Sequence, residues 1–201
     1  LQGLGCAAVI WCSVQALVQS RAKVLVAYST AAQLGYLVLA LSLLGTGSAA
    51  TDALFMLVLA HALAKAAMFM AVGNVMTASG SDRIQSLDDT LPSMPLSTAT
   101  MALAAVSLMG LPPSGGFLGK WRLLGIAIDH QQWLVVTALL AGTLLATAYC
   151  FRLLQPFFSG RRLRRLSVAG TREWSAFTLA TGAVLLGFAG AHPLLTGVLA
   201  R

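Results

Sequence analysis

The sequence predicts an all-α integral membrane protein, and three observations carry that prediction. The chain is 58% hydrophobic and only 9% charged, whereas soluble domains usually carry about 25% charged residues. Its apolar runs reach the length of roughly 20 residues that a helix needs to cross a bilayer. They are too long and too rich in alanine and leucine for buried strands, and in lipid only helices or closed barrels satisfy their own backbone groups. We therefore expect about six transmembrane helices, one of them broken.

Six apolar runs are the candidate spans. They cover residues 1–18, 24–44, 53–78, 96–128, 133–154 and 174–199. The fourth run would be about 50 Å long as one straight helix, whereas the apolar core of a bilayer is roughly 30 Å thick. No basic segment precedes the first run, so it is not typical of a signal peptide. We expect that an upstream part is missing or is a separate chain, with a processed or alternatively started protein as the alternative.

The basic residues alternate between the connections of these spans. The first connection holds Arg21 and Lys23, the third holds Arg83, and the second and fourth hold no lysine or arginine. The fifth connection holds Arg161, Arg162, Arg164, Arg165 and Arg172. Because connections rich in lysine and arginine stay on the cytoplasmic side, we expect both ends of this piece to lie outside. A bacterial inner membrane is the expected location.

The basic segment "GRRLRRLS" raises the question of nucleic acid, since the net charge of the chain is +7. The segment contains no interleaved aromatic residues and lies directly between two predicted spans. There it meets anionic headgroups, each basic residue contributing about 1 kcal/mol near the surface. We therefore expect anionic lipids, and no nucleic acid, among the partners.

No catalytic site or cofactor site is expected in this chain. Cys6, Cys12 and Cys150 lie inside predicted spans without the CxxC spacing of a redox or metal site. The sequence also lacks a Walker loop and a GxGxxG fingerprint after a strand. Any redox chemistry linked to this protein is therefore expected to occur in another chain.

Lys65, in the stretch "HALAKAAMFM", lies near the middle of the third span. A charged side chain at that depth costs about 2.5 to 3.5 kcal/mol unless it faces a protein interior or water. Because burial disfavours the charged form of an amine, such a lysine can take up and release a proton. His61 lies one turn earlier on the same face and is a candidate relay neighbour. The alternatives are a lysine that only locks helices together and a histidine that only packs.

A second intramembrane lysine, Lys120, occurs in the stretch "GLPPSGGFLGKW". Pro112 and Pro113 remove two backbone donors, and Gly115 with Gly116 loosens the chain that follows, so we expect the helix to break here. Lys120 would stand in the first turn after the break, near the positive end of a half-helix that disfavours its charge. This predicts a proton acceptor beside a hydrated pocket near the outer face. An ordinary proline kink with an interfacial lysine is the alternative.

Three stretches together resemble one family. They are "RAKVLVAYSTAAQLGY" at 21–36, "HALAKAAMFMAVGNV" at 61–75 and "GLPPSGGFLGKW" at 110–121. They are similar to the signature stretches of the antiporter-like subunits shared by respiratory complex I, membrane-bound hydrogenases and Mrp-type sodium/proton antiporters. The resemblance covers essentially the whole chain. It implies the second five-helix repeat at 1–155, a basic cytoplasmic loop at 156–173 and a final helix at 174–201.

The resemblance implies proton, or sodium/proton, translocation within a multisubunit complex such as an NADH:quinone oxidoreductase. Lys65 matches the central lysine of the second repeat, and Lys120 matches the broken-helix residue that exchanges protons with the outer side. Two departures from the family pattern leave fewer proton-carrying side chains in the pathway, because Gln33 and Leu57 stand where some relatives have histidines. Ser29, Gln33 and trapped water would then have to serve as the relay. The first repeat, with its glutamate–lysine pair, is not in these 201 residues, so a companion membrane subunit must supply it.

Two other functions stay open at this point. One is a degenerate repeat that serves only as a membrane scaffold, and the other is an unrelated small channel or transporter. In either case we expect contacts with other chains through small-residue faces. The predicted faces pair Ala31 with Gly35, and Gly182 with Leu186 and Gly190.

Overall fold

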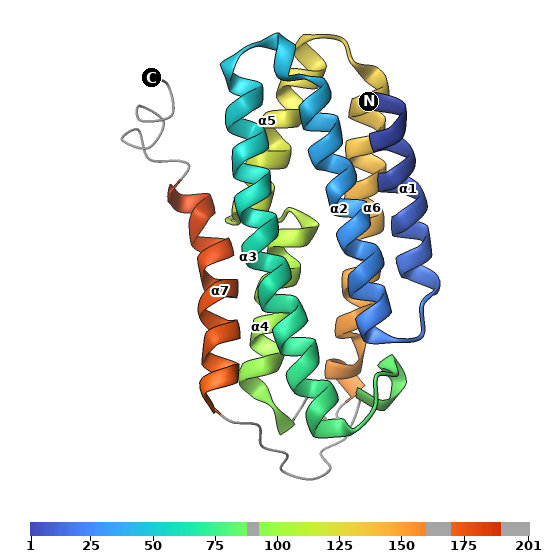
Figure 1. Cartoon of the computed structure of the whole chain (residues 1–201), viewed down its shortest axis with the longest axis vertical. Coiled ribbons are helices and arrows are strands. Elements are labelled where there is room, and N and C mark those ends of the chain that lie inside the picture. Colours follow the sequence, from blue (N-terminus) through green and yellow to red (C-terminus); the bar gives the residue numbers. More distant parts are fainter. Residues whose placement is uncertain (88–92, 160–169, 190–201) are drawn as a thin grey trace.

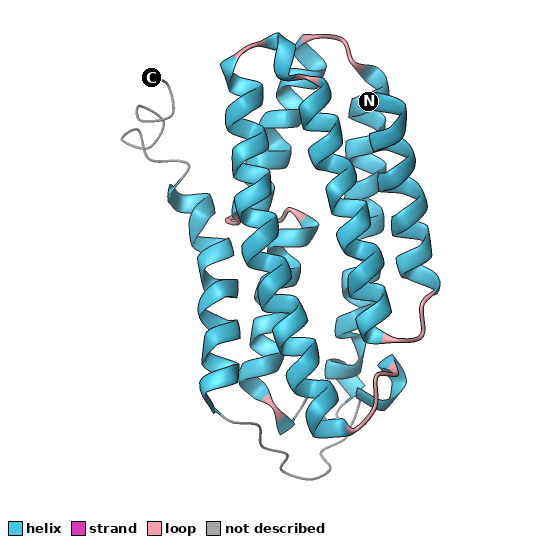
Figure 2. Cartoon of the chain, viewed as in Figure 1, coloured by secondary structure: helices cyan, strands magenta, loops and turns pink. Residues whose placement is uncertain are grey.

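The computed structural model describes residues 1–87, 93–159 and 170–189, and within them the chain is almost entirely helical (Figures 1 and 2). The seven α-helices of these residues are α1 Gln2–Val18, α2 Ala22–Ser42, α3 Ser48–Ser79, α4 Pro95–Met109, α5 Gly115–Asp129, α6 Trp133–Leu154 and α7 Gly170–Ala189. Short 3₁₀ turns follow α2, α3 and α6, as η1 Leu44–Thr46, η2 Ile84–Leu87 and η4 Gln155–Ser159. The predicted all-α fold is confirmed.

The helices run side by side as one elongated bundle, with α4 and α5 stacked end to end (Figure 1). Three helical segments, Ala22–Thr46, Ser48–Ser79 and Trp133–Phe158, are long and apolar enough to cross a membrane. The count of six spans stays a prediction. The arginines at 161–165 and the predicted end of the last span, 190–199, lie outside the described residues.

The long fourth run is interrupted as predicted, between α4 and α5. Helix α4 ends at Met109 and is capped by Gly110, whose φ of 76° is a left-handed conformation that glycine adopts without strain. Ser114 begins the next helix, because its Oγ accepts a hydrogen bond of 3.2 Å from the backbone N–H of Phe117. Each end of the interruption therefore has a capping residue of the expected chemistry.

The two glycines of this stretch have a different role from the one predicted. Gly115 and Gly116 lie in the first turn of α5 rather than in the interruption, and with 3.6 residues per turn Lys120 falls in the second turn. A Cβ on Gly116 would overlap the carbonyl group of Ser107, and one on Gly115 would lie 2.8 Å from Cβ of Leu186. The glycines therefore allow α5 to begin in close contact with α4 and α7, instead of loosening the chain.

The predicted small-residue faces also pack differently. A Cβ on Gly35 would lie 2.8 Å from the backbone nitrogen of Val9, so this glycine contacts α1 of the same chain. Gly182 faces Leu63 of α3, and Leu186 faces α5. Gly35, Gly182 and Leu186 thus contact helices of the same chain, because small residues permit a close approach without specifying which helix approaches, and contacts of these faces with other chains stay a prediction. Ala31 is half-buried, and Gly190 lies outside the described residues.

The buried side chains form two apolar clusters, one in each half of the bundle. On α2, residues 22–26 belong to one cluster and residues 36–43 to the other. On α3, residues 64–75 and 50–57 divide in the same way. On α2, the buried polar residues Ser29 and Gln33 lie between the residues of the two clusters, and Lys65 of α3 and Lys120 of α5 bond to or contact this part of α2. We call these residues the polar layer. The fold thus places a thin polar layer at the level of the interruption.

The contact between α1 and α2 can be tested by Gly35→Ala. The added methyl group meets backbone atoms, which cannot rotate away, so we expect a loss of about 1–3 kcal/mol in the free energy of unfolding. The measurement is thermal or denaturant unfolding of the chain in detergent. Gly73→Ala is the matched control, because nothing lies within 4 Å of a Cβ at that helical position. Equal stability of the two variants would refute this account of the packing.

Candidate functional site

Lys65 lies in the middle of α3 with only 5% of its surface exposed. Its Nζ donates hydrogen bonds to the carbonyl oxygen of Val26, at 3.2 Å, and to Oγ of Ser29, both on α2. Ser29 in turn donates to the carbonyl oxygen of Val26 at 2.8 Å. The amine is therefore held by α2 through neutral oxygen atoms. No carboxylate of the described residues forms an ion pair with Lys65.

Lys120 is buried in the same layer, with 7% of its surface exposed. Its Nζ donates to the carbonyl oxygen of Leu108 at 2.8 Å and lies 4.4 Å from the centre of the Tyr36 ring. A cation over an aromatic face is attracted by the electrons of the ring. Like Lys65, Lys120 is satisfied by groups without formal charge.

The carbonyl of Leu108 is available because of the proline that follows it. In a continuous helix this oxygen would accept from the backbone N–H four residues later, but Pro112 has no N–H. Lys120 therefore occupies an acceptor that the sequence itself releases. Pro112 lies four residues after Leu108 in the sequence, so a free acceptor at the Leu108 carbonyl could have been predicted from the sequence.

Gln33 donates to the same oxygen from the other side. Its Nε2 lies 3.0 Å from the carbonyl oxygen of Leu108 and 3.1 Å from the hydroxyl oxygen of Tyr149. The Leu108 carbonyl thus accepts from α2 and α5 at once. Sequence reasoning missed Tyr36 and Tyr149, because nothing in their local pattern shows that they point into the polar layer.

The polar residues of α2 follow one face of that helix. Ser29, Gln33 and Tyr36 are spaced by four and three residues, which places them in one row about 10 Å long. One end of the row binds Lys65 and the other end contacts Lys120. Ser29 and Gln33 share no hydrogen bond within the described residues, so one helical turn separates the two halves of the row.

His61 lies one turn before Lys65 on α3 and is half-buried. Its Nδ1 is buried and has no hydrogen-bond partner in the described part of the chain, and the same holds for Oγ of Ser107. The predicted relay neighbour is thus near the polar layer without a bond to Lys65. Leu57, one turn earlier, packs against Gly119 of α5, so that position is apolar and filled.

A cavity of about 430 Å³ lies beside Lys120, between α5 and α6. It is lined by Gly110, Phe117, Lys120, Trp121, Leu124, Leu139, Leu140, Thr143 and Leu144. Lys120 and Thr143 supply the only polar side chains of this lining. The side chains of α6 in this lining are mostly leucines, and the hydrated pocket expected beside Lys120 stays a prediction.

No three His, Cys, Asp or Glu side chains gather closely enough to hold a metal ion in residues 1–87, 93–159 and 170–189. Cys6, Cys12 and Cys150 are free thiols. The chemistry that this layer offers is therefore that of its two amines, one imidazole, and hydroxyl and amide groups.

Comparisons with known proteins bear on this arrangement. Residues 1–146 match the family model described as NADH:quinone oxidoreductase/Mrp antiporter, TM. Subunit N of NADH-quinone oxidoreductase from Desulforudis audaxviator is 32% identical over 206 residues, which cover 93% of this chain and 41% of that protein.

Two solved structures share the fold. A chain of the archaeal membrane-bound sulfane sulfur reductase is 26% identical with a TM-score of 0.87, covering 97% of this chain and 39% of that one. A chain of the Mrp complex from Dietzia is 18% identical with a TM-score of 0.81, covering 94% and 44%. The chain thus spans about two fifths of the length of these proteins. With a family model matching most of its residues, the chain belongs to the NADH:quinone oxidoreductase and Mrp antiporter family of membrane subunits.

Proposed function

We propose that this chain carries protons through part of a multisubunit membrane complex, with Lys65 and Lys120 as the groups that take up and release the proton. The observation that carries the proposal is the shared carbonyl of Leu108, on which Gln33 and Lys120 converge. This carbonyl links Gln33 to Lys120, and one helical turn of α2 separates Gln33 from Ser29, which bonds Lys65. The family resemblance to proton-translocating subunits supports the same reading.

Each member of the row has a role that its chemistry permits. The Ser29 hydroxyl can accept a proton from the Lys65 ammonium if it turns away from the Val26 carbonyl and passes its own proton to a water molecule that bridges the turn to Gln33. Gln33 does not titrate near neutral pH, so it orders the Leu108 carbonyl and any water that bridges the turn between it and Ser29. Lys120 receives or delivers the proton at the interruption. His61 serves as a second acceptor beside Lys65.

A purely structural subunit is the competing function, and the buried amines argue against it. A lysine in the membrane interior costs free energy relative to an apolar residue, and a scaffold would gain nothing from bearing that cost twice. The two lysines also lack a carboxylate partner in the described residues, so they do not form the ion pairs that a purely architectural role would favour.

The assembly around the chain follows from the same proposal. The first repeat is supplied by an upstream part of the same protein or by another membrane subunit, and the redox reaction, in a complex such as an NADH:quinone oxidoreductase, takes place in other chains. The piece sits in a bacterial inner membrane with both ends outside, and anionic lipids surround its basic connections.

Lys65→Met tests the first proton site. We expect proton transport by the assembled complex in vesicles to fall to the level of protein-free vesicles, because methionine fills the space but binds no proton. Lys23→Met is the control, since Lys23 is exposed at the start of α2 and should transport normally. Transport at the native rate by Lys65→Met, with the complex fully assembled, would show that Lys65 only packs.

Lys120 is tested by the order of two variants. Lys120→Glu keeps a titratable group but loses the donor to Leu108, so it should retain part of the transport. Lys120→Met loses both, and we expect it to transport least. The measurement is proton uptake by reconstituted vesicles containing equal amounts of complex. A methionine variant as active as the wild type would contradict the proposed role.

Gln33 tests the row that joins the lysines. Gln33→Leu removes the donor to Leu108 and Tyr149, so we expect slower transport with both lysines intact, whereas Gln33→His keeps a donor and should be faster than leucine. Thr77→Val is the control, because Thr77 is exposed and bonds only the carbonyl of Gly73 on its own helix. If the leucine variant matched the control, protons would have to move by another path.

A further inference from the structure

A polar pocket of about 460 Å³ lies at the end of the bundle where α1 meets α2 and where α3 and α6 end. It is lined by Ser20, Arg83, Ile84, Gln85, Arg152 and Gln155. The volume falls in the range of small-molecule sites, roughly 300–1,000 Å³. None of these residues belongs to the polar layer around Lys65 and Lys120, so the pocket has no part in the proposed proton pathway.

The backbone around this pocket is fixed by a short antiparallel bridge between two connections. The N–H of Ala22 donates to the carbonyl of Asp82 at 2.8 Å, and the N–H of Ile84 donates to the carbonyl of Ser20 at 2.9 Å. Nε of Arg21 lies 3.5 Å from the carboxylate of Asp82. The connection after α1 is thereby tied to the one after α3.

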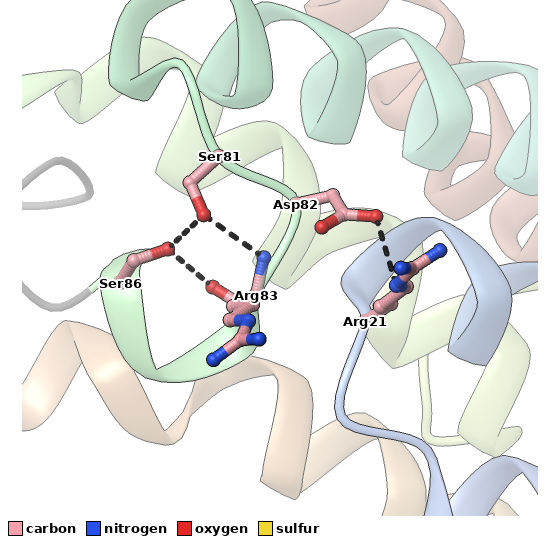
Figure 3. A network of polar contacts seen from close by, with 5 residues as sticks. All are labelled: Arg21, Ser81, Asp82, Arg83 and Ser86. Carbon is pink, nitrogen blue, oxygen red and sulfur yellow. Dashed lines mark hydrogen bonds and ion pairs between the residues drawn. The ribbon is translucent and has the colours of Figure 1, made fainter.

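A serine network holds the connection after α3 in shape (Figure 3). Oγ of Ser86 donates to the carbonyl of Arg83 at 2.7 Å and lies 2.8 Å from Oγ of Ser81, within hydrogen-bond distance. Oγ of Ser81 accepts from the N–H of Arg83 at 3.3 Å. The main chain of Arg83 is thus bonded on both sides, while its guanidinium takes no part in the network drawn in Figure 3.

The pocket concentrates positive charge that this part of the chain does not neutralise. Arg83 and Arg152 both line it, and within residues 1–87, 93–159 and 170–189 neither forms an ion pair. Asp82, the acidic residue beside Arg83, is engaged by Arg21. Two guanidinium groups with neighbouring amide and hydroxyl donors make a site for a tetrahedral oxyanion, because arginine matches phosphate with paired N–H donors.

The surroundings of the pocket indicate which phosphate it takes. Phe151 stands one turn before Gln155 on the same face of the helix, and it stacks on Phe158 with ring centres 6.3 Å apart. Phe151, Phe157 and Phe158 are 60%, 43% and 68% exposed. Large exposed aromatic groups beside an anion pocket suit a ligand with a phosphate head and apolar chains.

We propose that this pocket binds the phosphate of an anionic phospholipid, whose acyl chains lie along the phenylalanines at the end of α6. The end of the bundle that holds the pocket carries the basic connections, which are expected on the cytoplasmic side, where anionic lipids are abundant. The lipid joins the connections after α1 and α3 to the end of α6. This binding site is distinct from a general attraction of the basic segment 160–169 for the membrane surface.

The test compares two variants of the assembled complex that lose the same charge. Arg83→Gln with Arg152→Gln removes the pocket arginines, and Arg161→Gln with Arg162→Gln removes two arginines of the basic segment. Each complex is placed in nanodiscs of phosphatidylcholine with increasing phosphatidylglycerol, and bound phosphatidylglycerol is counted by native mass spectrometry. We expect the pocket variant to lose one tightly bound molecule, its affinity falling by about tenfold or more, while the segment variant keeps it.

Three results would overturn the proposal. Equal loss in both variants would show that only surface charge attracts the lipid. If the wild type and the pocket variant retained phosphatidylcholine equally, and the wild type showed no preference for phosphatidylglycerol, a site for an anionic headgroup would be excluded. Displacement of the bound molecule by millimolar inorganic phosphate would show that the pocket takes the free ion. Helix content by circular dichroism checks that each variant folds. If the double variant does not fold, Arg152→Gln is compared with Arg161→Gln. Equal retention of phosphatidylglycerol by these two single variants would again refute the site.

Discussion

The carbonyl of Leu108 is the group on which the arrangement of the polar layer depends. Pro112 cannot supply the N–H that would satisfy it, and inside a membrane no bulk water can replace that donor. Gln33 of α2 and Lys120 of α5 both donate to it. The interruption of the fourth run therefore fixes α2 against α5. It also brings the amine of Lys120 close to α2, the helix that bonds the amine of Lys65.

The rest of the bundle is organised around this layer. Apolar clusters fill the two halves of the bundle on either side of the polar layer. Glycines at helix–helix contacts let the helices approach closely. Gly116 lies so near the carbonyl of Ser107 that no side chain fits there. Close packing matters here because two buried lysines are tolerated only where protein oxygen atoms, and not lipid, surround their donors.

The sequence was informative where a single residue type has a local consequence. Two prolines in an overlong apolar run predicted the interruption, and a lysine in the middle of a span predicted a buried polar site. Contacts across helices could not be predicted in this way, since Tyr149 reaches Gln33 only because α6 packs against α2. The same limit explains the misassigned small-residue faces, where spacing showed that Gly35 could be approached but not that α1 approaches it.

Neither lysine has a carboxylate partner in the described residues. In the proposed pathway, the charge of each lysine therefore acts on the charge of the other. A positive charge on Lys65 disfavours one on Lys120, because charges interact more strongly in a protein interior than in water. The hydrogen bonds along α2 hold both amines in place while this repulsion changes. In the proposed pathway, a proton that arrives at one lysine would therefore promote release from the other. Polar contacts that leave both amines formally unpaired thus suit a group that must change its charge, whereas a tight ion pair would hold the proton in place.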